Sequence, residues 1–323
     1  MMEKVKKIKS GDVRTASRLI RHLEDGMAEA RATMKHLFPL TGHSHVIGIT
    51  GSPGAGKSTL IDGLVESFRK KGKTVGVLAV DPTSPFTGGA ILGDRIRMQR
   101  HAEDPGVFVR SLATRGSLGG LAKAVGDAIH IMDVMGKDIV LVETVGTGQQ
   151  EVDIINHSHT VIVVLIPGMG DEIQAIKAGI LEIADIFVIN KSDREGSSKL
   201  RRELMAMLDM APLSSFPAGW RPPILKCDNA FEPDGFVKSL EIMSQTSDDH
   251  YQHLIKHDLL GTRVHRKSAV ELNEAIKCSV LEPVLAKLVA NGELECMIEK
   301  LSKKETDPYT LAEEIAKRYL KAK

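Results

Sequence analysis

The 323-residue sequence contains few aromatic side chains and few cysteines, and each shortage excludes a class of protein. Aromatics make up 4% of the residues, so the core has to consist mostly of Val, Ile, Leu, Ala and Met. The three cysteines, Cys227, Cys278 and Cys296, lie far apart and form no CxxC pair. This spacing excludes a disulfide framework and a cysteine metal cluster, and it predicts reduced thiols in a reducing compartment.

Charge of a single sign and long apolar runs are also missing. The formal net charge is +1, and no basic face is interleaved with aromatics, so we expect no nucleic-acid partner. The basic start MMEKVKKIKSGD is not followed by the apolar segment that a secretory signal needs. The longest apolar run, Val161 to Ile166, is far too short to span a bilayer. The sequence therefore predicts a soluble, cytoplasmic protein without a membrane partner.

Both ends of the chain have helical periodicity. Apolar positions recur at helical spacing over 14–38, which predicts one or two amphipathic helices broken near Asp25-Gly26. After about residue 245 the β-rich runs stop, and 248–290 and 293–323 are predicted to be helical. These patterns divide the chain into an N-terminal helical extension over 1–42, a central domain over 43–245 and a C-terminal helical arm over 246–323.

In the central part, short β-rich runs alternate with helical stretches. Near-continuous apolar strands separated by helices are typical of an α/β fold, with a mostly parallel sheet covered by helices. Ligands of such sheets bind at the carboxyl ends of the strands, which is where the polar motifs of this sequence fall. The predicted strands are VIGIT (46–50), TVGVLAV (74–80), VFVRS (107–111), DIVLVE (138–143), TVIVVLI (160–166), DIFVIN (185–190) and PPILKC (222–227).

A glycine-rich stretch directly follows the first predicted strand and opens a helix. It matches the P-loop pattern GxxxxGK[ST], in which backbone N–H groups surround the β-phosphate of a nucleotide. Lys57 is expected to bridge the β- and γ-phosphates, and the Ser58 hydroxyl to bind Mg²⁺. A chance glycine-rich turn is the alternative, but the strand before and the helix after disfavour it. The stretch consists of Gly51, Ser52, Pro53, Gly54, Ala55, Gly56, Lys57, Ser58 and Thr59.

Three carboxylates are candidate metal ligands beside this loop. Asp81 and Glu143 each end a predicted strand, and Asp94 lies in the glycine-rich stretch TGGAILGD. A single carboxylate at a strand end is as often a helix cap, but three around one P-loop favour a Mg²⁺ site. Three residues after Glu143, the amide of Gly146 can approach the γ-phosphate because no Cβ is in the way.

A second motif predicts which base is bound. Asn190-Lys191-Ser192-Asp193 follows the strand DIFVI and matches NKxD. Asp193 can accept hydrogen bonds from guanine N1–H and from the exocyclic amine, and adenine lacks that pair of donors. Lys191 is expected to pack over the ring and Asn190 to brace the P-loop. Together the motifs predict that GTP or GDP binds with Mg²⁺.

Several longer blocks resemble the MeaB/ArgK-like family, which includes the methylmalonic aciduria type A protein. Members are GTPases that chaperone adenosylcobalamin-dependent acyl-CoA mutases, and they belong to the same broad group as the nickel chaperones of urease and hydrogenase. The resemblance extends from about residue 14 to 226. It is carried by DPTSPFTGGAILGDRIRM (81–98), RSLATRGSLGGLA (110–122), ETVGTGQQEVD (143–153), PGMGDEIQAIKAGILEIAD (167–185) and NKSD.

The resemblance implies a homodimer in which the C-terminal arm, 246–323, is the dimerisation arm. It also implies that the protein binds its mutase, gates cofactor loading and protects the cofactor, with GTP hydrolysis timing these steps. It implies that segments 81–98 and 143–153 are nucleotide-sensing switches, and that 167–180 is a third loop from which Lys177 reaches the nucleotide. Methylmalonyl-CoA mutase is the expected partner. The residues implied around Mg²⁺ are Ser58, Asp81, Asp94 and Glu143.

The sequence departs from the family pattern after the last strand. Lys226-Cys227-Asp228-Asn229 stands where a small Ser/Thr-Ala signature usually contacts guanine O6, which weakens the expected second base contact. Four arginines in or near the switch segments are candidates for stabilising charge on the γ-phosphate, although structural or partner contacts are the more common use of such residues. They are Arg95, Arg97, Arg100 and Arg115.

Three other functions compete with a mutase chaperone. A P-loop kinase would prefer ATP, which the NKSD motif disfavours. A scaffold that binds GTP without hydrolysing it is disfavoured by Lys57, Ser58 and Glu143. A nickel-insertion GTPase would need a metal cluster, and the HSH pairs His43/His45 and His157/His159 have no neighbouring cysteine.

Overall fold

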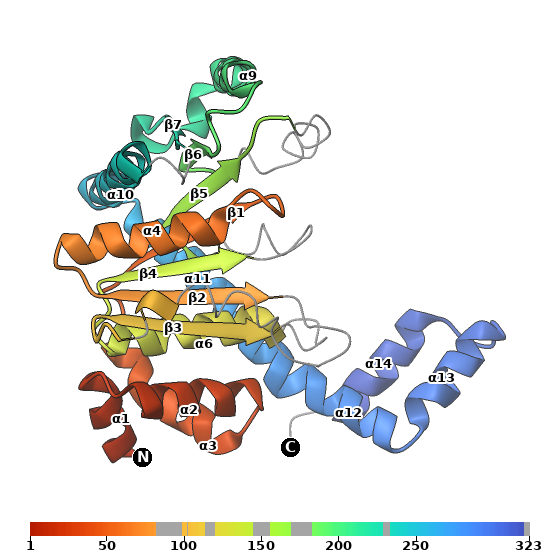
Figure 1. Cartoon of the computed structure of the whole chain (residues 1–323). Helices are drawn as coiled ribbons and strands as arrows, with labels where there is room; N and C mark the ends of the chain where they lie inside the picture. The colour runs from red at the N-terminus through yellow and green to blue at the C-terminus, as the bar shows by residue number, and fades with distance from the viewer. Residues whose placement is uncertain are drawn as a thin grey trace. The chain divides into compact units, whose positions relative to one another are not determined.

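A single parallel sheet positions the P-loop and the NKSD turn of the central part. The computed structural model describes residues 1–81, 99–101, 103–113, 120–144, 156–168, 183–228 and 233–319. In these residues seven strands form one sheet in the order β3-β2-β4-β1-β5-β6-β7, with all neighbours parallel (Figure 1). The strands are β1 His45–Gly51, β2 Val75–Asp81, β3 Val107–Ala113, β4 Ile139–Thr144, β5 Thr160–Leu165, β6 Ile186–Ile189 and β7 Ile224–Lys226.

The strands form where the sequence is continuously apolar. Every residue of β1, β4, β5 and β6 is buried, as expected for parallel strands with both faces covered. All seven predicted strands are present, and their ends differ from the prediction by at most two residues. The predicted α/β fold is therefore confirmed.

Helices cover the two faces of the sheet with separate apolar clusters. On one face, Leu60, Ile61, Leu64 and Phe68 of α4 and Leu240 and Met243 of α10 pack on the central strands. On the other face, residues of α2, α3 and α6 form a second cluster with β1 to β4, and α9 packs on β5 and β6. These helices are α2 Val13–Glu24, α3 Ala28–Leu37, α4 Lys57–Lys70, α6 Gly120–Val134, α9 Ser197–Met210 and α10 Pro233–Lys256.

The N-terminal helices follow the predicted periodicity, with one addition. Helix α2 is capped by Asp12, whose carboxylate accepts from Thr15 N at 2.6 Å. The predicted break at Asp25-Gly26 separates α2 from α3, and Gly26 has φ +71°, which favours glycine. Helix α1, Met2–Lys9, was not predicted, because only Val5 and Ile8 of its residues are buried.

The chain divides into two compact units, Met1–Val270 and Glu271–Lys323. The boundary predicted at 245/246 lies inside α10, and the three-part division of the chain remains a prediction. Helix α11, Leu260–Ile276, extends into the second unit and is followed by a π-helical turn, Lys277–Leu281. The second unit also contains α12 Glu282–Ala290, α13 Glu293–Ser302 and α14 Pro308–Tyr319.

Candidate functional site

The P-loop lies between β1 and α4 and packs against two neighbouring segments. Gly51 has φ +139°, and a Cβ there would lie 2.1 Å from Val164 O of β5. Gly56 has φ +87°, and a Cβ there would lie 2.5 Å from Asn190 Nδ2. Only glycine fits at both positions, since each combines a left-handed backbone with a close contact. The loop therefore packs closely against β5 and against the turn after β6.

Lys57 is the first residue of α4, and its side chain lies inside the loop. The residue is 6% exposed. Its ammonium donates to the carbonyl oxygens of Gly51 and Ser52, the latter at 2.9 Å. Because the first N–H groups of a helix are free to bind an anion, the loop presents a buried positive charge together with helix dipole and backbone donors.

Glu143 and Ser58 meet beside this charge. Glu143 is in β4, the strand next to β1, and is 1% exposed. The Ser58 hydroxyl donates to Glu143 Oε1 at 2.8 Å. A hydroxyl and a carboxylate are oxygen donors of the kind that Mg²⁺ prefers, so this pair fits the ion. Asp81 ends β2, whose Val80 pairs with Thr144 of β4, and so reaches the same edge of the sheet.

Some predicted site residues lie outside the described residues. They are Asp94, Gly146 and Lys177, together with three of the four candidate arginines, Arg95, Arg97 and Arg115.

The NKSD turn contacts the P-loop directly. Asn190 donates from Nδ2 to Ala55 O at 2.7 Å, and Lys191 donates from Nζ to Gly54 O at 3.1 Å. Lys191 has φ +54°, which turns the chain sharply after β6. Asp193 is exposed. The turn is thus joined to the loop 135 residues earlier, and the two motifs form one site.

Two contacts of this turn were not foreseen from the sequence. The Ser192 hydroxyl donates to Asp228 Oδ1 at 3.1 Å, and Ser192 N donates to Cys227 O at 3.1 Å. Asp228 is in the stretch that departs from the family pattern, and no motif marks it. Burial raises the pKa of the Cys227 thiol to about 12, so this cysteine is neutral and inert at physiological pH.

One histidine of each HSH pair, His45 and His159, takes part in a polar network at the opposite edge of the sheet, where the strands begin. Burial keeps the pKa of His45 well below its usual value and lowers the pKa of His159 to about 3. His45 Nε2 lies 2.8 Å from Thr160 Oγ1, and His159 Nδ1 accepts from Val46 N at 3.1 Å. Both rings are therefore neutral structural groups. Among the described residues no three His, Cys, Asp or Glu side chains gather as metal ligands.

The same network continues into α10 and α11. Thr160 Oγ1 lies 2.9 Å from His250 Nδ1, and His250 Nε2 lies 3.2 Å from Asp185 Oδ1. Arg263 donates to both oxygens of Asp185, at 2.6 and 2.8 Å, and to His159 O at 2.7 Å. Although burial opposes it, the hydrogen bonds from His250 and Arg263 hold the pKa of Asp185 below its usual value.

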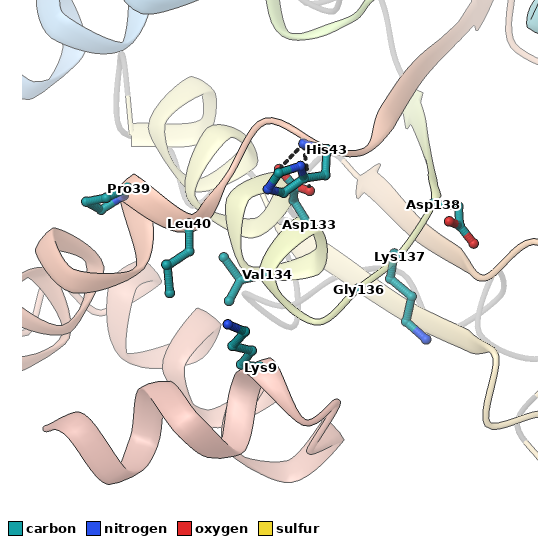
Figure 2. Close-up of a pocket in the computed structure, with 9 residues that line it drawn as sticks. All are labelled: Lys9, Pro39, Leu40, His43, Asp133, Val134, Gly136, Lys137 and Asp138. Atoms are coloured by element: carbon teal, nitrogen blue, oxygen red, sulfur yellow. Dashed lines mark hydrogen bonds between the residues drawn. The ribbon is translucent and has the colours of Figure 1, made fainter.

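A cavity of about 420 Å³ also lies at this edge (Figure 2). The Asp133 carboxylate beside it accepts from three successive backbone N–H groups, those of Gly42, His43 and Ser44, at 2.5 to 3.3 Å. The Lys137 ammonium donates to Gly106 O at 3.1 Å. These charges serve the fold. The lining residues are Lys9, Pro39, Leu40, His43, Asp133, Val134, Gly136, Lys137 and Asp138.

Comparison with known proteins gives consistent matches. The family described as "Methylmalonyl Co-A mutase-associated GTPase MeaB" matches residues 16–290. A Pyrococcus abyssi protein named as a GTPase is 47% identical over 318 residues, which cover 98% of this chain and 95% of the relative. A Caenorhabditis elegans protein named a mitochondrial methylmalonic aciduria type A homolog is 38% identical over 185 residues, 56% of this chain and 46% of the relative.

Among solved structures, that of an LAO/AO transport system kinase aligns with a TM-score of 0.64 at 22% identity. The alignment covers 99% of this chain and 97% of that one, and at this identity the likeness shows the fold alone. None of the described helices has both the length and the apolar composition that a membrane span needs.

Proposed function

The chain belongs to the MeaB family of methylmalonyl-CoA mutase-associated GTPases, and we propose that it hydrolyses GTP to gate and protect the adenosylcobalamin cofactor of methylmalonyl-CoA mutase. The observation that supports GTP binding is the contact between the P-loop and the NKSD turn, in which Asn190 donates to Ala55 O at 2.7 Å. A phosphate-binding loop and a guanine-reading turn that touch each other can bind the two ends of one nucleotide.

The phosphates bind in the P-loop. The backbone N–H groups of Gly54 to Thr59 surround the β-phosphate, and Lys57 exchanges its carbonyl partners for the β- and γ-phosphates. Mg²⁺ fits the oxygen donors at this end of the site, and when bound it neutralises charge on the phosphates. Its proposed ligands are Ser58, Asp81, Asp94 and Glu143.

Hydrolysis proceeds by in-line attack of water on the γ-phosphorus, which breaks the bond from phosphorus to the β–γ bridging oxygen and releases GDP and inorganic phosphate. Because negative charge builds up on the phosphoryl oxygens in the transition state, the buried ammonium of Lys57 stabilises it more strongly than solvent does. The amide of Gly146 donates to the γ-phosphate, and Lys177 adds a second positive charge when the mutase is bound. Positioning of water and phosphate supplies the remaining rate enhancement.

Asp193 selects guanine at the other end of the nucleotide. It is the exposed last residue of the NKSD turn, where its carboxylate accepts from guanine N1–H and the exocyclic amine. ATP would leave this carboxylate facing an adenine edge that lacks the paired donors, which costs binding free energy.

A homodimer is part of the proposal. In the second unit, Cys278, Leu288 and Leu311 are the buried apolar residues among those described, whereas a larger apolar set is 41% to 61% exposed. A helical unit with so little core of its own is stabilised by a second copy. The exposed set contains Leu272, Ile276, Leu281, Leu285, Val289 and Ile298.

The partner is tested by GTP hydrolysis with purified methylmalonyl-CoA mutase. We expect the kcat for GTP to rise as the mutase is added and ATP to stay inert. The Lys57→Ala variant mixed with the same mutase is the control for contaminating phosphatase. GTP turnover that no concentration of mutase alters would overturn the partner and leave the GTPase in place. A preference for ATP would overturn the role of Asp193.

A further inference from the structure

The turn that ends in Asp193 contains a strained backbone position and is anchored on two sides. Lys191 has φ +54°, a left-handed conformation that is unfavourable for a residue with a Cβ and persists only where contacts hold it. On one side, Asn190 and Lys191 donate to carbonyl oxygens of the P-loop, at 2.7 and 3.1 Å. On the other side the turn is held through Ser192, the residue between the strained position and Asp193.

The anchor at Ser192 uses both its backbone and its side chain. Ser192 N donates to Cys227 O at 3.1 Å, and the Ser192 hydroxyl donates to Asp228 Oδ1 at 3.1 Å. Cys227 and Asp228 directly follow β7. Hydrogen bonds to a carboxylate are stronger than those between neutral groups. The side-chain bond therefore ties the residue next to Asp193 to the end of the neighbouring strand.

Asp228 is in turn placed by the first turn of α10. Its Oδ2 lies so close to Gly235 that a Cβ on this glycine would be 2.9 Å away. Asp228 N donates to Ser239 Oγ at 3.4 Å, and the Ser239 hydroxyl donates to Gly235 O at 2.8 Å. A carboxylate is favoured at the amino end of a helix because of the helix dipole. Since α10 packs on the sheet through Leu240 and Met243, this support belongs to the core of the domain.

We propose that Ser192 and Asp228 are positioning residues for guanine recognition, and that their hydrogen bond holds the carboxylate of Asp193 in line with the edge of the base. The inference rests on the proposed function, in which Asp193 selects guanine. A carboxylate accepts from N1–H and from the exocyclic amine at once only when both of its oxygens are aligned with these donors. A small movement of the turn therefore weakens two hydrogen bonds together.

The test compares GDP with inosine diphosphate, whose base keeps N1–H but lacks the exocyclic amine. For the wild type we expect GDP to bind about 10- to 100-fold more tightly, because the analogue leaves one oxygen of Asp193 without its donor. Ser192→Ala and Asp228→Ala should each lower the affinity for GDP about tenfold. The affinity for inosine diphosphate should fall less, so that the preference drops at least about threefold. Competition with a fluorescent GDP analogue measures both affinities.

The controls separate positioning from a general loss of structure. Asp228→Asn keeps an acceptor oxygen for the Ser192 hydroxyl and should restore most of the preference for GDP. Thr310→Ala removes a hydroxyl that donates to the Asp307 carboxylate at 2.5 Å in the second unit, and it should leave both affinities unchanged. Inorganic pyrophosphate can bind the P-loop but has no base, so its affinity should stay within about twofold in every variant.

A double-mutant cycle isolates the contact itself. If Ser192 and Asp228 act through one hydrogen bond, the double alanine variant binds GDP no more weakly than either single variant. Losses that multiply would contradict the proposal, as would pyrophosphate binding that weakens as much as GDP binding.

Asp193→Asn distinguishes this inference from the function on which it rests. If Asp193→Asn removes the preference for GDP over inosine diphosphate and Ser192→Ala leaves it unchanged, the positioning role is wrong and the role of Asp193 stands. If Asp193→Asn leaves the preference unchanged, the proposed reading of guanine by Asp193 is wrong, and the positioning role is wrong with it.

Discussion

The two edges of the sheet both carry charged side chains, but they use them differently. At the edge where the parallel strands begin, called here the amino edge, Asp185 accepts hydrogen bonds from Val161 N, His250 and Arg263 and is 7% exposed. At the carboxyl edge, Lys57 is held by carbonyl oxygens of its own loop, and Asp193 is exposed. Charges at the amino edge are neutralised inside the protein, whereas those at the carboxyl edge are placed where a nucleotide can replace their partners.

This difference teaches how to separate structural from functional charges in one domain. A buried carboxylate with four donors stabilises the fold only while its partners remain, because a buried charge that loses its partner is costly. A charge that binds backbone carbonyls at a loop can be removed with little loss of stability. Substitutions at the two edges should therefore affect different measurements.

The largest effect on stability is expected at the amino edge. Asp185→Asn leaves the buried end of Arg263 without its counter-charge and His250 without its carboxylate partner, so we expect the free energy of unfolding in urea to fall by about 3 to 5 kcal/mol. The kcat for GTP of the folded protein should stay within about twofold of wild type. Glu203→Gln, which breaks the exposed pair with Lys199, is the control and should cost less than about 0.5 kcal/mol.

The converse substitution is at the carboxyl edge. Lys57→Ala removes the buried ammonium that faces the phosphates, so we expect kcat for GTP to fall by about 100- to 1,000-fold. The free energy of unfolding should change by no more than about 1 kcal/mol. A loss of stability as large as that of Asp185→Asn would remove the distinction between the edges.

A smaller effect should appear in base selection. Asp193→Asn replaces one acceptor oxygen by an amide donor, so we expect GTP affinity to fall by about 10- to 100-fold. Binding of xanthosine triphosphate, which has a carbonyl in place of the exocyclic amine, should improve. Competition with a fluorescent GDP analogue measures both. Unchanged selectivity would show that Asp193 does not contact the base.

The smallest effect is a dependence of stability on pH that arises from the amino edge. The folded-state pKa of His159 is about 3 because the ring is buried and lies near Lys267 and Arg263, below the usual 6.5. Stability is therefore lost as pH falls below 6.5, by about 1 kcal/mol per buried histidine between pH 7 and 5.5. Asp185 has a lowered pKa and contributes to acid loss only below pH 3.8.

Urea unfolding of His159→Asn at pH 7 and pH 5.5 measures this dependence. Asparagine keeps an acceptor for Val46 N but cannot titrate, so the variant should lose about 1 kcal/mol less than wild type over this range. Equal losses in the two proteins would assign the acid sensitivity to other groups.

Local patterns made much of the fold and of the nucleotide site predictable. The strands are continuous apolar runs, and the P-loop and NKSD are short motifs whose contact, Asn190 to Ala55, was expected from the motif alone. Helix α1 was missed because only two of its eight residues are buried apolar ones, which is too few to show a helical periodicity in the sequence.

The unforeseen contacts join residues that are far apart in sequence and lie in no motif. Ser192 and Asp228 are separated by 36 residues. Asp62 and Arg100 are separated by 38 residues, and Asp185 and Arg263 are separated by 78 residues. Taken singly in the sequence, each of these residues is of a type that is common at polar surface positions. Only the order of the strands and the packing of α4, α10 and α11 bring such partners together.

The central claim, that the carboxyl edge binds the nucleotide and the amino edge supports the fold, is tested most directly by amide hydrogen–deuterium exchange with and without GDP and Mg²⁺. We predict slower exchange over 51–59 and 190–193 when the nucleotide is bound, and unchanged exchange over 45–47, 159–161 and 250–263. Protection over 39–43 and 133–138, around the cavity at the amino edge, with none over 51–59 would contradict the account.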